Sequence, residues 1–276
     1  RPEFSMVTGI STGALSASFA FLGPDYDDEL KAVYTTTSTA QIARQRDAIA
    51  VAFADSVVDT APLREMIRSH IDTDIIEAIA REHARGRRLY IGTVNLDASR
   101  EELIRDVLQA SASIPVAFPP VERPVEADGN PFDEMHVDGG TGSQSFVYPA
   151  AENWREITGK LKVRGASVVY MIRNAFLDSD YRGVKRGIIP IGIRTIDSLI
   201  RTQGIGDLYQ IHSLCARDGN EFNLAYIPSS FTEEPKESFD PNYMGKLFDL
   251  GYRMAVEGYP WEKTPPGFRA IEGDGG

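Results

Sequence analysis

The pentapeptide GISTG at residues 9–13 joins a short apolar stretch to a run of small residues, and it constrains this chain more than any other segment. Residues 5–10 are typical of a β-strand and residues 12–21 of a buried helix. A serine at such a junction projects its hydroxyl beyond the sheet edge, and the helix N-terminus points amides toward a developing oxyanion. We therefore expect Ser11 to be a nucleophile, with Gly9 and Gly13 keeping side chains out of the tight turn.

Strand and helix patterns alternate along the rest of the chain. Apolar residues recur at helical spacing from Pro62 to a stop at Gly86, and residues 88–96 alternate as a strand. Residues 118–133 are expected to form a loop or a hairpin. Further helices are expected at 27–35, 97–112, 191–217 and 242–258, and strands at 134–138, 167–173 and 222–227. This order predicts an α/β fold whose mostly parallel sheet is covered on both faces.

Composition narrows the classes of protein that the chain can be. Its 276 residues carry 29 Lys and Arg against 40 Asp and Glu, a net charge of −11 that disfavours nucleic acid as a partner. No apolar run approaches the ~18 residues needed to span a bilayer, so an integral membrane protein is excluded, while cytoplasm and cell envelope stay open. The lone Cys215 is expected to be a small buried residue. We expect one domain over residues 1–264 and a frayed tail over 265–276.

A nucleophilic serine needs a base, and the chain has four histidines to offer. His70 and His83 lie on a helical pattern and are typical surface residues. His212 comes late in the chain, where a Ser-Asp-His triad would place its histidine. His136 lies two residues before an aspartate on a predicted strand and shares a face with it.

The other candidate base is that aspartate, Asp138, which ends a predicted strand and is followed by Gly139 and Gly140. A carboxylate beside a serine hydroxyl can act as the general base directly. Two glycines after it allow the backbone to approach closely. The residues alone leave the choice between Asp138 and a histidine open.

Three blocks in a fixed order decide between them: GISTGAL at 9–15, ASASIPVAFPP at 110–120 and VDGG at 137–140. Together they resemble the patatin-like phospholipase family over about the first 150 residues. The resemblance implies a three-layer α/β/α sandwich with Ser11 as nucleophile and Asp138 as base of a dyad that uses no histidine. It also implies that residues 111–120 wall the site, and that acyl esters of phospholipids and other lipids are hydrolysed through an acyl-serine, without a metal or cofactor.

The chain departs from the family pattern in two places. The family carries a glycine-rich oxyanion loop on the unit before the nucleophile's strand, and only ten residues precede Ser11. The remaining donor is the backbone N–H of Thr12, so we expect a weak or inactive enzyme, since losing one donor costs about 10²- to 10³-fold in rate. A missing strand would also leave an open sheet edge and favour a homodimer. Second, residues 141–146 replace the family's Asn-Pro-rich run.

An acyl chain needs apolar side chains around it, and an anionic lipid surface needs basic side chains that face it. Phe19, Pro115 and Phe118 are expected to wall the acyl pocket, together with Phe21, Leu22 and Val116. A peripheral membrane surface is a further candidate partner, and the docking face would be formed by Arg182, Lys185 and Arg186 near Phe176 and Tyr181.

Two other functions remain compatible with these patterns. One is an α/β-hydrolase esterase that uses Ser11, an aspartate and His212, although that fold places several strands before its nucleophile and this chain has room for one. The other is a catalytically silent scaffold of the same fold that binds lipid or a partner protein.

Overall fold

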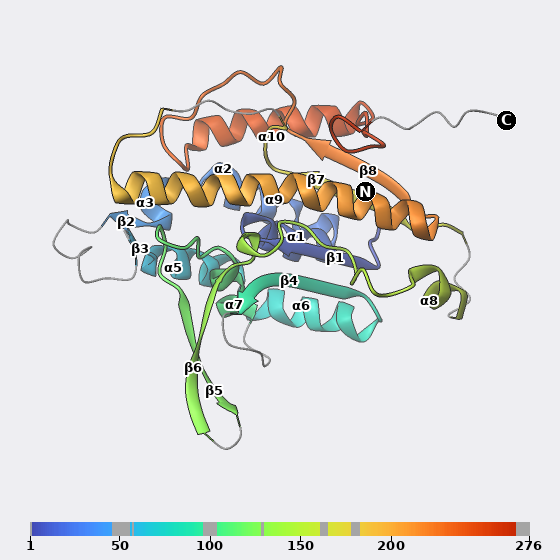
Figure 1. Cartoon of the computed structure of the whole chain (residues 1–276), viewed down its shortest axis with the longest axis horizontal. Coiled ribbons are helices and arrows are strands. Elements are labelled where there is room, and N and C mark those ends of the chain that lie inside the picture. Colours follow the sequence, from blue (N-terminus) through green and yellow to red (C-terminus); the bar gives the residue numbers. More distant parts are fainter. Residues whose placement is uncertain are drawn as a thin grey trace.

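The computed structural model describes residues 2–45, 56, 58–95, 104–127, 130–160, 165–177 and 183–268 (Figure 1). Strands and helices alternate over most of this length. Their order is β1 (Met6–Ile10), α1 (Thr12–Leu22), η1 (Pro24–Tyr26), α2 (Asp27–Thr35), α3 (Thr39–Ile42), β2 (Arg44–Gln45), β3 (Val58–Asp59), α5 (Ala61–His70), α6 (Thr73–Ala84), β4 (Arg88–Asn95), α7 (Ile104–Ser111), β5 (Val121–Ala127), β6 (Asn130–Asp138), η2 (Gly139–Thr141), α8 (Trp154–Lys160), β7 (Val168–Arg173), α9 (Ile188–Asp218), β8 (Glu221–Tyr226) and α10 (Pro241–Val256).

The strand pairings bring the end of β1 beside the end of β6. Strands β1 and β4 are parallel, with Ile10 opposite Gly92. Strand β6 runs antiparallel to β4, with Asp138 opposite Thr93, the next residue along β4. Strands β5 and β6 form an antiparallel hairpin, as expected for residues 118–133, and β7 and β8 form a parallel pair. The register therefore places Ser11 and Asp138 at the same edge of the sheet.

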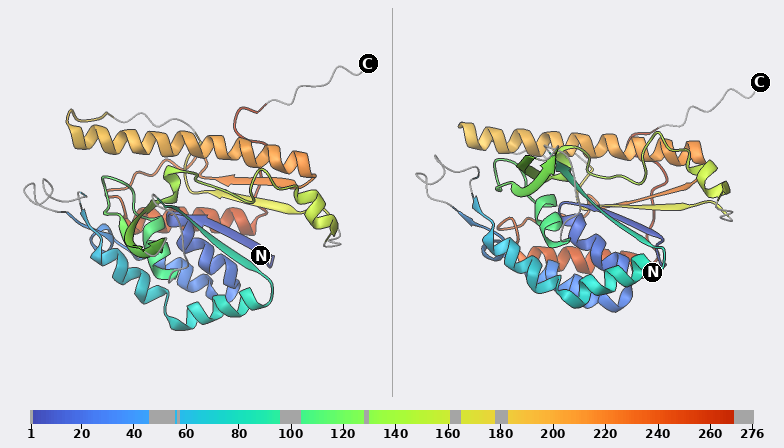
Figure 2. Two further views of the ribbon diagram at one scale, coloured as in Figure 1. Left: turned by 60° about the horizontal axis from the view of Figure 1, so that its bottom comes forward. Right: turned by 90° about the horizontal axis from the view of Figure 1, so that it is seen from below.

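Helices cover the strands on both faces (Figure 2). Helix α9 lies alone along one face, and α1, α2, α6 and α10 lie on the other. A sheet between two helical layers is the three-layer α/β/α arrangement, so the predicted fold class is confirmed. A helix on each face lets the strands bury both sets of side chains.

The helical pattern from Pro62 to Gly86 forms two helices rather than one. Helix α5 ends at His70, and Asp72 then takes an extended backbone and accepts a hydrogen bond from the amide of Ile75, 2.9 Å away. An aspartate at an N-cap favours a new helix start over continuation of the old helix. The start of the helix expected at 97–112 lies outside the described residues, which resume with α7.

Two clusters of apolar side chains form the core. One surrounds α1 and includes Phe19, Phe21 and Ile71, none of which exposes any surface. The other lies between α9 and the β7–β8 pair and contains Leu224 and Cys215. Burial raises the pKa of the Cys215 thiol to about 11, so this residue is the small buried apolar side chain that its sequence predicted.

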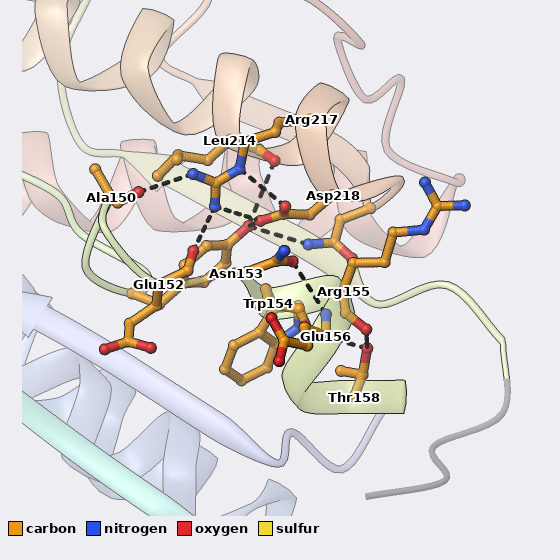
Figure 3. Close-up of polar contacts among 12 residues, drawn as sticks. Ala150, Glu152, Asn153, Trp154, Arg155, Glu156, Thr158, Leu214, Arg217 and Asp218 are labelled. Atoms are coloured by element: carbon orange, nitrogen blue, oxygen red, sulfur yellow. Dashed lines mark hydrogen bonds and ion pairs between the residues drawn. The ribbon is translucent and has the colours of Figure 1, made fainter. Parts of the chain in front are cut away.

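The C-terminal end of α9 is tied to the segment before α8 (Figure 3). The guanidinium of Arg217 donates to the carbonyl oxygens of Ala150 and Glu152 at 2.7 and 2.6 Å, and pairs with Asp218 at 2.7 Å. Asp218 also accepts from the Tyr148 hydroxyl at 2.7 Å, and these bonds lower the pKa of its carboxyl, with Arg217 the largest cause. This network fixes one end of the long helix to the body of the protein.

The chain after α10 returns to the second core. Pro265 is buried, the hydroxyl of Tyr209 donates to the Pro266 carbonyl at 2.7 Å, and Phe268 packs on His212 with ring centroids 4.7 Å apart. The predicted frayed tail is therefore packed as far as Phe268, because Pro265 is buried and because Tyr209 and His212 of α9 contact Pro266 and Phe268. Residues 269–276 lie outside the described part of the chain. In that described part, no helix combines the length and apolarity that crossing a membrane requires.

Candidate active site

Ser11 lies at a strained turn between β1 and α1. Its φ of 54° and ψ of −130° put an L-residue in a region where side chains are rarely found. Such strain persists only where the surroundings impose it, and it is typical of a nucleophile displayed at a strand-to-helix turn. The expected geometry for a nucleophilic serine is therefore present.

Three glycines let the segments around this turn approach closely. A Cβ built at Gly9 would lie 2.3 Å from the carbonyl oxygen of Gly13, and one at Gly139 would lie 2.4 Å from that of Gly92. A Cβ at Gly92 would lie 2.7 Å from the Ile10 side chain. Gly13 differs, because a Cβ there would meet nothing within 4 Å. The steric reason expected for both glycines of the pentapeptide therefore applies to Gly9 alone.

The Ser11 hydroxyl lies close enough to the Asp138 carboxyl to lower its pKa as a hydrogen-bond donor. The amide of Gly140 donates a hydrogen bond to Asp138 Oδ1 at 2.7 Å. Asp138 exposes only 2% of its surface, and this desolvation raises the pKa of its carboxyl, partly offset by the two donors. A buried carboxylate beside a strained serine is the arrangement that direct general-base catalysis requires.

The Ser111 hydroxyl connects the turn to the neighbouring strand. Its Oγ accepts the backbone N–H of Ser11 at 2.8 Å and donates to the carbonyl oxygen of Gly92 at 2.6 Å. Ser111 is fully buried, so both bonds are shielded from water. Sequence reasoning assigned this residue to the wall of the site and missed its contact with the Ser11 amide. The side chain holds the strained turn against β4.

The second sequence block, residues 110–120, is also hydrogen-bonded to the third, residues 137–140. The amide of Asp138 donates to the carbonyl oxygen of Ser113 at 2.9 Å, and the Ser113 hydroxyl donates to Gln109 in α7 at 3.0 Å. The end of α7 thus contacts Ser11 through Ser111 and Asp138 through Ser113. All three blocks meet at one point of the fold.

The first turn of α1 is held from α2. The Tyr34 hydroxyl donates to the carbonyl oxygen of Thr12 and accepts from Ser16 Oγ, which lies 2.8 Å away. Burial raises the pKa of Tyr34 to about 12, so the hydroxyl stays protonated as a donor. The backbone N–H of Thr12 opens the helix, where amides have no intrahelical partner. Its role as an oxyanion donor stays a prediction.

The histidines have other partners. Among the described residues, the hydrogen bonds of Ser11 and Asp138 include no histidine. His212 packs between Phe222 and Phe268, with ring centroids 5.3 and 4.7 Å away. His136 Nε2 lies 3.3 Å from the carboxylate of Glu134. The alternative triad with His212 therefore lacks the hydrogen bond between Ser11 and the histidine that it requires.

The expected acyl-pocket residues separate into two groups. Phe19 is fully buried within the α1 core cluster, as is Phe21, so both contribute to the core and not to a pocket wall. Residues two positions apart on a helix point in nearly opposite directions, so α1 is buried on more than one side within this cluster. Pro115 and Phe118 are half-buried beside Ser113, and Val116 between them has a φ of 69°, a second strained backbone position close to the site.

The segment after the VDGG block is ordered by a carboxylate from α9. Asp207 Oδ2 accepts the backbone amides of Gln144 and Ser145 at 2.5 and 3.1 Å, and the Ser143 hydroxyl at 3.2 Å. Residues 141–146, where the sequence departs from the family pattern, are thus held by α9. Over the described ranges, no cluster of three or more His, Cys, Asp or Glu side chains is arranged to hold a metal ion.

Comparison with known proteins agrees with this geometry. The sequence model of the patatin-like phospholipase family matches residues 1–151, which contain all three blocks. The chain belongs to this family. A comparison with curated proteins finds no match. Membership in the patatin-like family makes the protein a lipid acyl hydrolase in general terms, and its α/β/α layers are those of the patatin domain.

We expect the two glycines of the patatin-like turn to respond differently to alanine. Gly9→Ala should lower the free energy of unfolding by about 3 kcal/mol, because the new methyl overlaps the Gly13 carbonyl. Gly13→Ala should leave it unchanged or raise it by up to about 1 kcal/mol, because the methyl meets open space in a helix. Urea unfolding measures both, and equal effects would contradict the packing described for Gly9.

We expect Ser111→Ala to lower the free energy of unfolding by about 1–3 kcal/mol, because it leaves the Ser11 amide and the Gly92 carbonyl without their partner. The matched control is Ser69→Ala, which removes an exposed hydroxyl bonded to the Met66 carbonyl and should change stability by less than about 0.5 kcal/mol. The same urea titrations compare them, and a Ser111 variant as stable as the control would refute the bridging role.

Proposed function

We propose that this protein hydrolyses acyl esters of phospholipids, as a phospholipase A or lysophospholipase, with Ser11 as nucleophile and Asp138 as general base. The observation that carries the proposal is the position of Ser11, which lies at a strained strand-to-helix turn and close enough to the buried Asp138 carboxyl to lower its pKa. Membership in the patatin-like family supports the class of substrate.

The proposed reaction has two halves. Asp138 accepts the hydroxyl proton while Ser11 Oγ attacks the ester carbonyl carbon, and the Thr12 amide donates to the developing oxyanion. The alcohol portion leaves with a proton returned from Asp138, and an acyl-serine remains. Asp138 then takes a proton from water, which attacks the acyl-serine and releases the fatty acid. The carboxylate acts as base in each attack and as acid in each departure.

We also propose that residues 1–264 form one acyl-hydrolase domain, although the family match ends at residue 151. Elements beyond that point complete the same core. Phe239 packs against the α1 cluster and its amide donates to Thr39 Oγ1 at 3.0 Å. Lys31 of α2 lies over the ring of Phe248 in α10, 5.2 Å from its centroid.

The dyad can be tested with a fluorophosphonate probe, which reacts with activated serines. In the full protein, we expect Ser11→Ala to abolish labelling and ester turnover, and Asp138→Asn to lower both by about 10³-fold or more, because the base is lost. His212→Ala is the matched control and should retain activity within about threefold. Labelling that survives Ser11→Ala would refute the nucleophile, and loss of activity in His212→Ala would restore the triad.

The pH profile of ester turnover tests the state of the base. Burial raises the pKa of Asp138 above its ordinary 3.8, and Asp138 must be ionised to accept the proton. We therefore expect turnover to fall on acidification with an apparent pKa above 3.8. A raised pKa in the folded state also means that wild type loses stability relative to Asp138→Asn as pH rises through that pKa. An acid limb at or below 3.8, or a stability difference independent of pH, would contradict the assignment.

A further inference from the structure

Among the described residues, nothing buries the N-terminal half of α9. Every buried residue of this 31-residue helix lies at Gly204 or beyond, so positions 188–203 contain none. These positions are nevertheless rich in isoleucine and leucine. Ile188, Ile191 and Leu199 expose 93%, 52% and 64% of their surfaces. An exposed apolar patch of this kind marks an interaction site.

The three most exposed apolar residues, Ile188, Ile191 and Leu199, share one face of the helix. Ile188, Ile191, Thr195 and Leu199 follow the three- and four-residue spacing that aligns side chains along a helix. Val184, Ile191 and Leu199 also line an open groove of about 390 Å³ on this side. We call residues 184–199 the α9 surface.

The charge of this region is opposite to that of the protein. Residues 183–203 contain the cations Lys185, Arg186, Arg194 and Arg201 and one acidic residue, Asp197, whereas the whole chain carries −11. Asp197 is paired with Arg194 at 2.7 Å. Lys185 and Arg186 are exposed immediately before the first turn of α9, next to the most exposed isoleucine. An apolar helix face flanked by cations matches an anionic lipid surface.

The α9 surface adjoins the candidate dyad. Ile200 Cγ2 lies 3.6 Å from the position that a Cβ on Gly140 would occupy, and the Gly140 amide donates to Asp138. In Figure 1, α9 passes η2, the short turn that follows Asp138, and its N-terminal half continues beyond it. One helix thus contacts the catalytic loop in its middle and presents apolar side chains toward its N-terminus.

We propose that the α9 surface docks the protein on anionic lipid bilayers and so brings the dyad to the lipid–water interface. This inference rests on the proposed function, because an enzyme that hydrolyses bilayer lipids must reach esters that lie in the membrane. A second copy of the chain fits less well. A two-fold contact through this face would place the same basic surface, with Lys185 and Arg186, on both sides of the interface.

The test is flotation of the full protein with vesicles. Wild type should bind vesicles of mixed phosphatidylglycerol and phosphatidylcholine and bind phosphatidylcholine vesicles at least about tenfold more weakly, because the cations face an anionic surface. The combined variant Ile188→Ser, Ile191→Ser and Leu199→Ser should bind the mixed vesicles at least about tenfold more weakly. The charge variant Lys185→Glu with Arg186→Glu should also bind the mixed vesicles at least about tenfold more weakly. At high salt, which screens these charges, its binding should no longer differ from that of wild type.

The matched control is Tyr252→Ser with Val256→Ser on α10, where the side chains are 63% and 70% exposed but belong to another surface. The control should bind as wild type does. All of the altered side chains are exposed, so every variant should keep the wild-type circular dichroism and melting temperature. Vesicle binding that is the same in wild type and in the α9 variants would overturn the proposal.

Two further readouts separate this inference from the proposed function. The α9 variants should keep fluorophosphonate labelling and turnover of a soluble short-chain ester, while Ser11→Ala should still float with vesicles. Wild type that labels but never floats would refute the docking surface alone. Wild type that floats but never labels would refute the dyad alone. Light scattering over a concentration series that shows a dimer lost in the Ile188 variant, with no flotation, would overturn the proposal in favour of self-association.

Discussion

The two hydrogen bonds of the Ser111 hydroxyl join the three segments that position Ser11. One buried oxygen accepts the amide of Ser11 and donates to the carbonyl of Gly92, so it joins α7, the β1–α1 turn and β4. With that amide held, the turn keeps a φ that an L-residue would otherwise leave. The Ser11 hydroxyl is then directed toward Asp138, which the register of β4 and β6 has brought to the same edge.

The candidate site lowers the stability of the fold, and burial of apolar side chains in the adjacent core offsets this loss. A strained serine and a buried carboxylate with a raised pKa both oppose folding at neutral pH. The helix that follows the serine also buries Phe19 and Phe21 completely, and fully burying a side chain of this type contributes about 1.5–3 kcal/mol. The same helix therefore carries both the strained turn and part of the apolar packing that offsets its cost.

Helix α9 is divided between two environments. Its C-terminal half is buried against β8 and tied down by Arg217 and Asp218, while its N-terminal half buries no residue. The two halves meet near the loop after Asp138, where Asp207 holds the amides of residues 144 and 145. Because one half is anchored, a contact made by the exposed half would be held at a fixed place relative to the loop after Asp138.

The sequence alone determined the elements and the chemical groups of this protein. Local residue patterns predicted β1, α1 and α2. Turn context predicted Ser11 as nucleophile, and the resemblance to the patatin-like family favoured Asp138 over the histidines as base. Only the tertiary structure showed that Ser111, separated from Ser11 by 100 positions, holds its amide, that Gly92 must lack a side chain, that Phe19 belongs to the core, and that only one half of α9 is covered. Periodicity and turn residues reflect backbone preferences over a few neighbours, whereas these contacts depend on which surfaces meet after distant segments pack.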